Sequence, residues 1–318
     1  MKVIKLNHPH SYKNNDFPSI VMALGFFDGV HIGHQKVINQ AKEIAAQHKQ
    51  QSAVMTFDPH PSVVLGKGKT DVHYITPLED KIKLMAKLKV DYLFVVHFTK
   101  EFSQLLPEEF VKSYLIQLNV KHAVAGFDFT YGKFGKGTMQ TLPSHAQGFF
   151  DVTIIPKLEI HHQKISSTSI RQFIQNGEME KANRLLGRYF TTKGPVIHGK
   201  KRGRTLGFPT ANIRTDHDYL LPQIGIYIVK VFAAGMWKQG VCSVGFNPTF
   251  HNPEGKQLSI EIYLLDFDQD IYGEIVTVEW HKRIRDEKKF NDIEQLKAQI
   301  QKDIENTREY FSSLNEET

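Results

Sequence analysis

The sequence predicts two domains of different class: an α/β domain with a parallel sheet, and then a mainly β domain that ends in one helix. Three observations support this prediction. The 318 residues leave room for about two domains of ordinary size. Strand and helix patterns alternate in the first half, which is typical of parallel strands covered by helices. Short apolar runs separated by Gly, Pro and Asn fill the second half, which favours an antiparallel barrel or sandwich.

Five short apolar runs in the first half predict the strands of the parallel sheet. They span residues 20–26, 53–57, 92–96, 123–126 and 152–155. Apolar residues at helical spacing lie between them. They predict three helices, marked first by Val37, Ile38, Ala41, Ile44 and Ala45, then by Leu78, Ile82, Met85 and Leu88, and then by Phe110, Tyr114 and Leu118. Pro77 is expected at the first position of the second helix. Sheets of this kind bind ligands at the carboxyl ends of their strands.

The pattern changes near Gly187, so we expect a first domain of residues 1–186 and a second of residues 187–318. Runs rich in Val, Ile, Phe and Tyr predict strands at residues 226–231, 241–244, 258–264 and 275–280. The last helix is predicted from an apolar stripe of Phe290, Ile293, Leu296, Ile300 and Ile304.

The composition, with 41% hydrophobic and 23% charged residues, is that of a globular protein. Because Cys242 is the single cysteine, no internal disulfide can form, and we expect a reducing, cytoplasmic location. The polar first ten residues do not read as a secretory signal, and no apolar run approaches the ~18 residues of a membrane span. The net charge of +6 suits nucleic acid or anionic metabolites such as nucleotides, and solubility alone explains it equally well.

Two histidines, His31 and His34, lie where the first predicted strand passes into a helix. Both imidazoles can donate to phosphate oxygens, and a helix N-terminus adds backbone N–H groups and a favourable dipole. Gly33 is expected to let a nucleotide approach the backbone closely. The stretch therefore predicts a place where charge developing on a phosphate is stabilised. The alternatives are two surface histidines or a zinc pair, but zinc needs further ligands and no cysteine cluster is near.

A second phosphate contact is predicted from Ser166, Ser167 and Thr168, with Arg171 one turn later. Helix capping by these hydroxyl groups is an equally good explanation when they are taken alone. Their combination with the histidine pair favours phosphate binding.

A basic, glycine-bearing loop over residues 198–212 predicts an anion site in the second domain. Its glycines allow backbone N–H groups to turn toward an anion. Thr210 and Asn212 lie two residues apart, and so on one side of a strand, from which their oxygens suit Mg²⁺. A solvated basic loop is the alternative. An ordinary P-loop is excluded because Val63 stands where Gly68-Lys69-Thr70 would need its first glycine.

Together these stretches resemble the bacterial bifunctional riboflavin kinase/FAD synthetases. The first domain is similar to the nucleotidyltransferase superfamily, and in detail to the FMN adenylyltransferase module, at residues 25–34, 56–61, 126–129 and 165–168. The second resembles riboflavin kinase at residues 207–212, 245–250, 261–267 and 285–290. The resemblance implies a Rossmann-like nucleotidyltransferase domain with a parallel sheet, followed by a small antiparallel Greek-key β-barrel with a C-terminal helix.

For the first domain the resemblance implies adenylyl transfer: the FMN phosphate attacks the α-phosphate of ATP, which gives FAD and diphosphate. The transition state would be stabilised by His31 and His34. The groups that hold the triphosphate would be Ser166, Ser167, Thr168 and Arg171. Further ATP and FMN contacts are expected from Gly25, Phe27, Asp28, Gly29, Gly33 and Asp128. The last of these stands where the family often has Asn.

For the second domain the resemblance implies transfer of the γ-phosphate of ATP to riboflavin, which gives FMN. Glu261 would act as general base on the terminal ribityl hydroxyl. Mg²⁺ and ATP would be bound by Thr210 and Asn212, and the remaining ATP contacts would come from Gly203, Gly207 and Pro209. The expected flavin contacts are Arg285 and Glu287.

Two other functions remain open at this point. A tRNA-handling protein would share the His-Ile-Gly-His stretch and the basic charge, but its barrel should interleave aromatic and basic residues on one face. Tyr227, Phe232 and Trp237 do not follow that pattern. A non-catalytic flavin carrier would need neither Glu261 nor paired phosphate contacts. We therefore expect small nucleotides and flavins as partners, no nucleic acid or membrane, and a monomer or weak self-association.

Overall fold

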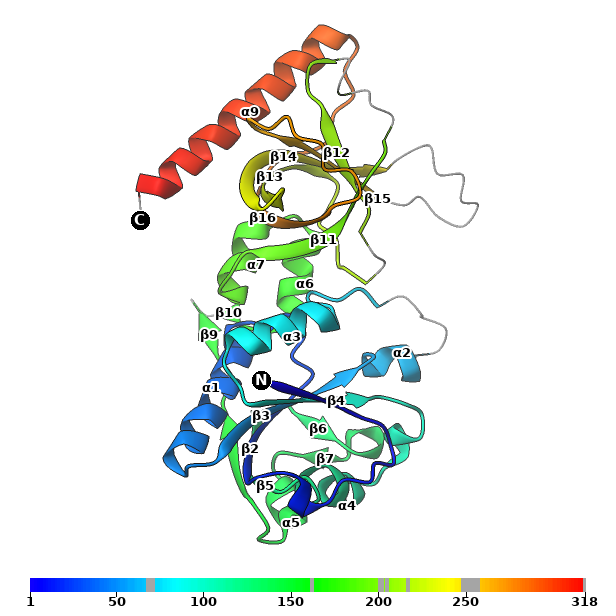
Figure 1. Ribbon diagram of the computed structural model, residues 1–318, viewed down its shortest axis with the longest axis vertical. Coiled ribbons are helices and arrows are strands. Elements are labelled where there is room, and N and C mark those ends of the chain that lie inside the picture. Colours follow the sequence, from blue (N-terminus) through cyan, green and yellow to red (C-terminus); the bar gives the residue numbers. More distant parts are fainter. Residues whose placement is uncertain are drawn as a thin grey trace. The chain divides into compact units, whose positions relative to one another are not determined.

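The computed structural model of the chain describes residues 1–66, 72–160, 163–199, 203, 206–215, 218–246 and 258–316. It divides into two compact units, Met1–Ser167 and Thr168–Thr318, which we call the first and the second unit and describe one at a time (Figure 1). This division lies earlier in the chain than the boundary expected after residue 186. That boundary, as a limit between two functions, stays a prediction.

A six-stranded parallel sheet forms the centre of the first unit (Figure 1). Its strands lie in the order β1 (Lys2–Leu6), β4 (Tyr92–His97), β3 (Gln51–Asp58), β2 (Ile20–Leu24), β5 (Val120–Gly126) and β8 (Asp151–Ile155). All neighbouring pairs are parallel, which confirms the predicted sheet. Every residue of β2 is buried, because helices cover both faces of the sheet. The sequence did not indicate β1, because Lys2 and Lys5 interrupt its short apolar run.

Helices α1 (Ile32–Gln47) and α3 (Leu78–Lys87) pack on one face of the sheet. The five residues predicted for the apolar stripe of α1 are all buried, in one cluster with Val21 and Val54 of the sheet. The helical position predicted for Pro77 is wrong by one residue. Its ψ of 160° is extended, so Pro77 is the N-cap of α3 and the helix begins at Leu78.

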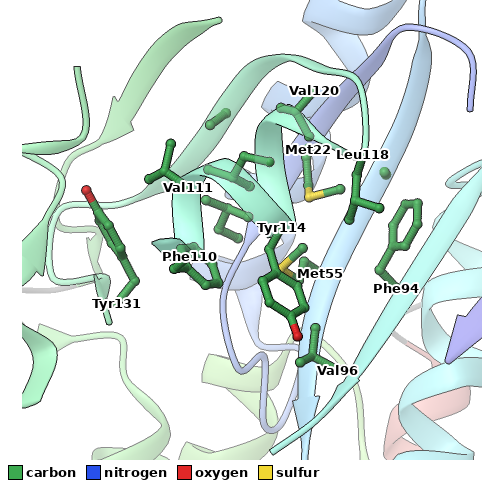
Figure 2. Packing of buried hydrophobic residues seen from close by; sticks show 14 of the residues in the cluster. Met22, Met55, Phe94, Val96, Phe110, Val111, Tyr114, Leu118, Val120 and Tyr131 are labelled. Carbon is green, nitrogen blue, oxygen red and sulfur yellow. The ribbon is translucent and has the colours of Figure 1, made fainter. Parts of the chain in front are cut away.

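The third predicted helix lies on the other face of the sheet and has two parts. A short helix, α4 (Pro107–Phe110), runs directly into a π-helical segment, η3 (Val111–Ile116). Figure 2 shows side chains of the apolar cluster that joins this segment to the sheet, among them Met22, Met55, Phe94, Phe110, Val111, Tyr114 and Leu118. The core of the first unit is thus two apolar layers, one on each face of the sheet.

Short elements complete the first unit. The helices are α2 (Pro61–Leu65) and α5 (Leu142–Ala146), with 3-10 turns η1 (Asn14–Asp16), η2 (Phe102–Gln104) and η4 (Lys133–Gly135). Two small hairpins are formed by β6 (Thr130–Tyr131) with β7 (Gly137–Thr138), and by β9 (Glu159–Ile160) with β10 (Gln163–Lys164).

The second unit is built on a closed barrel of antiparallel strands (Figure 1). Their order is β11 (Phe190–Ile197), β12 (Thr210–Ile213), β15 (Leu258–Leu264), β14 (Met236–Phe246), β13 (Gly225–Ala233) and β16 (Ile275–Arg285). Strands β13, β14 and β15 pair in succession, and β16 returns to lie beside β13. This arrangement is a Greek key, so the predicted barrel is confirmed.

Strands β11 and β12 were not among the predicted strands. Buried and half-buried residues alternate along the whole of β11, as in a strand with one face inside a barrel. Its inward positions include Thr192 and Gly194, so the apolar signal is too weak to find from the sequence. The hydroxyl of Thr192 is buried but has a hydrogen-bond partner, because it accepts the indole N–H of Trp280 at 3.0 Å.

Two helices precede the barrel strands. They are α6 (Ser167–Gln175), whose first residue belongs to the first unit, and α7 (Met179–Leu186). Helix α7 packs on β11 and β16. Asn183 fixes it there: its amide Nδ2 donates to the carbonyl of Trp280 at 2.8 Å, and its Oδ1 accepts the N–H of Phe190 at 2.7 Å.

The predicted C-terminal helix is confirmed as α9 (Ile293–Glu316), but its predicted apolar stripe is partly wrong. Phe290 precedes the helix, and the side chain of Ile293 is 58% exposed. Ile304 is buried as predicted, Leu296 and Ile300 are half-buried, and Phe311, which was not predicted, also lies on the buried face. Among the described residues, no helix has the length and apolar character that a membrane crossing requires.

Candidate active sites

The loop that follows β2 lies at the point where the strand order of the sheet reverses. From β2 the chain proceeds to β3 and β4 on one side, whereas β5 lies on the other side. Such a switch point opens a crevice at the carboxyl ends of the strands, where doubly wound sheets bind ligands. Helix α1 starts from this loop and packs on β2, β3 and β5. The fold therefore aims the N-terminus of α1 at the crevice.

His31 is the N-cap residue of α1. Its backbone is extended, with φ −69° and ψ 172°, and its ring Nδ1 accepts the backbone N–H of His34 at 3.1 Å. A ring nitrogen that accepts carries no hydrogen, so the neutral His31 ring carries its proton on Nε2. The ring is 5% exposed and stacks on the ring of His34, with centroids 3.5 Å apart and planes 17° from parallel. The structure thus brings both predicted histidines together.

The ring of His31 fits because residue 33 has no side chain. A Cβ atom on Gly33 would lie 3.1 Å from Cε1 and 3.2 Å from Nδ1 of His31. Gly25 makes room in the same way for the ring of Phe27, which a Cβ would approach to 2.9 Å. The ring of Phe27 in turn meets the ring of His34 edge-on at 5.2 Å. Gly25 and Gly33 therefore leave room for the rings of Phe27 and His31 in the same loop.

The backbone between Phe27 and His31 turns sharply. Gly29 has φ 85°, the left-handed region that glycine adopts without steric cost. Asp28 is 3% exposed, and its carboxylate accepts the N–H of Thr76 at 3.0 Å and of Ile75 at 3.3 Å. This carboxylate is therefore engaged by the segment before α3, and its expected contact with a nucleotide stays a prediction.

One residue of the hydroxyl-rich stretch, Ser167, contacts the same loop. The hydroxyl of Ser167 donates to the backbone carbonyl of Asp28 at 2.9 Å, and Ser167 is the first residue of α6. Ser166 directly precedes it in the chain. Thr168 and Arg171 belong to the second unit, so their distance from the histidines stays a prediction.

Asp128 lies just beyond β5, one strand away from the loop. Its side chain is mostly exposed, and its Oδ2 is 4.0 Å from the Nζ of Lys164. This geometry leaves the side chain accessible to a ligand from solvent, and its expected role near the nucleotide or flavin stays a prediction.

Lys81 is a site residue that sequence reasoning missed. It lies on α3, is 2% exposed, and its Nζ donates to the carbonyl of Phe26 at 2.8 Å and to the hydroxyl of Thr56 at 3.2 Å. A signal was present: Lys81 stands three residues after Leu78 and four before Met85, on the face of the helix that the apolar stripe occupies. A lysine at such a position needs partners inside the protein.

In the second unit, the register of three strands assembles the candidate kinase residues. Asn212 of β12 lies opposite Glu261 of β15, and Ser243 of β14 lies opposite Glu261 on its other side. Thr210 lies opposite Tyr263 on the same face. The positions between them in β15 are buried and face the barrel interior. The prediction that Thr210 and Asn212 share one side of a strand is confirmed.

Glycines of the preceding loop lie directly against these two side chains. A Cβ on Gly199 would overlap the amide of Asn212, at 2.2 Å from Nδ2. A Cβ on Gly203 would lie 2.3 Å from the carbonyl oxygen of Phe208 and 3.3 Å from the hydroxyl of Thr210. Gly207 has φ 91° and Pro209 is exposed in the same turn. Lys200, Lys201, Arg202 and Arg204, the predicted basic residues, lie outside the described residues.

Both expected flavin residues, Arg285 and Glu287, pack against other parts of the second unit. Arg285 donates from Nη2 to Oδ2 of Asp303 at 2.7 Å and from Nε to Oδ1 at 3.1 Å, which ties β16 to α9. Glu287 lies against Gly245, where a Cβ would approach its Oε1 to 3.2 Å. Their flavin contacts stay predictions.

The charge of Glu261 reaches the thiol of Cys242. Burial, and secondarily this charge, raise the pKa of the Cys242 thiol well above its usual value. The thiol is fully buried and stays protonated, so it is inert as a nucleophile.

Among the described residues no three His, Cys, Asp or Glu side chains are grouped to hold a metal. A cation at either site would therefore depend on neutral oxygens and substrate phosphates.

The chain has the features of a transferase with two sites: a parallel-sheet unit with a histidine pair at a helix N-terminus, and a barrel unit with its own carboxylate and neutral oxygens. Family models agree with this division: FAD synthetase matches residues 13–169 and riboflavin kinase matches residues 186–311. The chain belongs to the family of bacterial bifunctional riboflavin kinase/FMN adenylyltransferases. It is an enzyme of FAD biosynthesis that acts on riboflavin, FMN and ATP.

Two curated relatives carry that bifunctional name. The protein of Listeria monocytogenes serovar 1/2a is 54% identical and covers 99% of this chain and 100% of its own. The protein of Bacillus subtilis strain 168 is 51% identical, with 99% of each chain covered. A crystal structure from Streptococcus pneumoniae, described there as a macrolide-efflux protein, has the same fold: its TM-score is 0.87 at 35% identity, over 97% of this chain and 99% of that one.

Proposed function

We propose that His31 and His34 stabilise the charge that develops on the α-phosphate of ATP during adenylyl transfer. An oxygen of the FMN phosphate forms the new bond to the α-phosphorus, and the bond to the leaving diphosphate breaks. The observation that carries this proposal is the cap geometry of His31, because an accepting Nδ1 makes Nε2 the proton donor of the neutral ring. Ser166, Ser167, Thr168 and Arg171 hold the triphosphate in this mechanism.

We propose that Glu261 is the general base of the kinase reaction. It takes the proton of the terminal ribityl hydroxyl while that oxygen bonds to the γ-phosphorus of ATP and ADP leaves. The half-buried position of Glu261 on the barrel wall, opposite Asn212, supports this role. Buried isoleucines flank it on the other face of the strand, so the carboxylate cannot turn inward without exposing them.

Thr210 and Asn212 fit a Mg²⁺ ion bound together with ATP. Both offer neutral oxygens on one strand face, and the backbone of Gly199 and Gly203 packs directly against the two side chains. An ion held there neutralises phosphate charge.

We also propose that the protein acts as a monomer or with weak self-association, without nucleic acid, in the cytoplasm, where its single buried cysteine stays reduced.

A reciprocal experiment tests both assignments in one protein. Glu261→Gln is expected to lower FMN formation from riboflavin by about 10²–10⁴ and to leave FAD formation from supplied FMN unchanged. His31→Asn keeps a side chain that caps the helix and is expected to lower FAD formation by about 10²–10³ with FMN formation unchanged. Flavins separated by chromatography over time give both rates.

Matched controls lie on the same elements. His48→Gln changes an exposed histidine at the other end of α1, and Glu279→Gln changes a half-exposed strand carboxylate of the barrel. Neither is expected to affect either reaction. Kinase activity retained in Glu261→Gln would remove Glu261 from its role, and full FAD output from His31→Asn would make the histidine pair structural.

A further inference from the structure

Lys81 is a buried cation that no step proposed above uses. Its Nζ donates to the carbonyl of Phe26 at 2.8 Å and to Thr56 Oγ1 at 3.2 Å, and it lies 4.1 Å from the centroid of the Phe26 ring. Thr56 donates to the same carbonyl at 2.7 Å. The Phe26 carbonyl thus accepts two hydrogen bonds, one of them from an ammonium group. Phe26 lies two residues beyond the end of β2, in the loop that leads to the histidines.

Two contacts join this loop to the start of α3: in one a side chain of α3 holds the loop backbone, and in the other a side chain of the loop holds the backbone before α3. The Lys81 ammonium on α3 holds the backbone carbonyl of Phe26, and the carboxylate of Asp28 in the loop holds the backbone N–H groups of Ile75 and Thr76. The residue between them, Phe27, has φ 56°, a left-handed conformation that is strained for a side chain of this size. The contact to the Phe26 carbonyl fixes the peptide before Phe27, and the carboxylate contact fixes the side chain of the residue after it, so both keep this turn in place.

We propose that Lys81 is a positioning residue for adenylyl transfer: its ammonium group holds the turn at Phe26–Asp28 and thereby the site of His31, and adenylyl transfer weakens when that group loses its proton. Hydrogen bonds from a charged donor are about twice as strong as neutral ones, and only the charged form is attracted to the face of the Phe26 ring. The kinase reaction in the barrel does not depend on this contact.

Burial lowers the pKa of Lys81 from its ordinary 10.5 to about 8, and the charges of Asp28 and Asp58 partly oppose this shift. These two carboxylates come from the loop and from the end of β3. His60 and Tyr74 are the other titratable groups near it, and both rings contact the ring of Phe26. Of the acidic residues on α3 itself, Asp80 is the direct neighbour in sequence. The ammonium therefore loses its proton in the mildly alkaline range.

Stability and activity respond to this deprotonation in opposite directions. Between about pH 8 and pH 10.5 the unfolded chain still binds the Lys81 proton and the folded chain does not, so this group raises the free energy of unfolding as the pH rises. A loss of adenylyl transfer over the lower part of that range is then not explained by unfolding. This difference separates a positioning role from a merely structural one.

The test follows FAD formation from supplied FMN and ATP against pH, with FMN formation by the same protein as internal reference. The wild type is expected to show a decrease in kcat as the pH rises through about 8. Lys81→Met is expected to lower kcat for FAD formation by about 10- to 100-fold at neutral pH, to lose the alkaline decrease, and to keep the wild-type rate of FMN formation. Lys81→Arg keeps a charge at all these pH values, so it should shift the decrease to higher pH.

Lys83→Met is the matched control, because Lys83 is exposed on the same helix two residues later. It is expected to match the wild type in both reactions. The proposal is overturned if the alkaline decrease persists unchanged in Lys81→Met, or if that variant keeps the wild-type kcat. Should Lys81→Met fail to fold, the wild type and Lys81→Arg decide: no decrease in the wild type, or one that arginine does not shift, also overturns it.

Discussion

At the scale of single residues, Gly33 controls the position of the His31 ring. A Cβ there would stand 3.1–3.2 Å from two ring atoms of His31, so the ring would have to move by a few tenths of an ångström. We expect Gly33→Ala to lower FAD formation by about three- to tenfold, since small misplacements of reacting groups are costly. The rate of FMN formation should not change.

Thermal unfolding gives the second measurement for Gly33→Ala. Alanine is the better helix former by up to about 1 kcal/mol, so the first unit should unfold at the same temperature or higher while its activity falls. Asn39→Ala, at an exposed position of the same helix, serves as control. A Gly33→Ala enzyme with the wild-type rate of FAD formation would show that the ring has room to adjust.

Residue-scale prediction from sequence reaches the contacts that neighbours in the chain make, and it misses those that distant segments make. The histidine pair is local, because the cap bond joins residues 31 and 34. The carboxylate of Asp28 accepts N–H groups almost fifty positions away, which no local pattern reveals, and its contact with a nucleotide stays a prediction. Lys81 was not singled out from the sequence, because its position on α3 does not reveal the carbonyl of Phe26 that its ammonium group reaches.

At the scale of elements, one buried ion pair holds the C-terminal helix to the barrel. Asp303 of α9 is 1% exposed and accepts from Arg285 of β16 and, at 3.0 Å, from Gln299. Removing one partner leaves the other charge buried without compensation, which costs about 3–5 kcal/mol. Asp303→Ala is therefore expected to lower the free energy of unfolding of the second unit by about 3 kcal/mol.

Tryptophan fluorescence in denaturant measures this effect selectively, because Trp237 and Trp280 are the two tryptophans of the chain and both lie in the barrel. Glu305→Ala, two residues along the same helix on its exposed face, should stay within about 0.5 kcal/mol of the wild type. Equal stabilities of the two variants would mean that the helix does not contribute to the folding of the barrel.

Element prediction depended on how apolar each strand is. The inner strands β2, β3 and β4 could be predicted, because a strand that is covered on both faces has a continuous apolar sequence. In contrast β11 packs Thr192 and Gly194 inward, and β12 is only four residues long, so neither gives an alternating apolar signal. The register that sets Asn212 opposite Glu261 is a long-range pairing, and no local pattern encodes it.

At the scale of the whole molecule, the helix α7 decides where an independent kinase fragment should begin. Four of its apolar side chains are almost fully buried, namely Met179, Ala182, Leu185 and Leu186. The helix packs on β11 and β16, and Asn183 bonds to both Phe190 and Trp280. A fragment that starts at residue 187 exposes this wall of the barrel, whereas one that starts at residue 168 keeps it covered.

We expect the fragment 168–318 to fold, to unfold in one transition seen by tryptophan fluorescence, and to form FMN at the rate of the full chain. For the fragment 187–318, the free energy of unfolding should be lower by at least about 3 kcal/mol. This fragment lacks two leucines and a methionine, and each large apolar side chain lost from burial costs about 1.5–3 kcal/mol. Identical unfolding of the two fragments would place the boundary of the folded kinase after α7. A failure of both to form FMN, with their tryptophans in a native environment, would mean that the kinase site requires residues of the first unit.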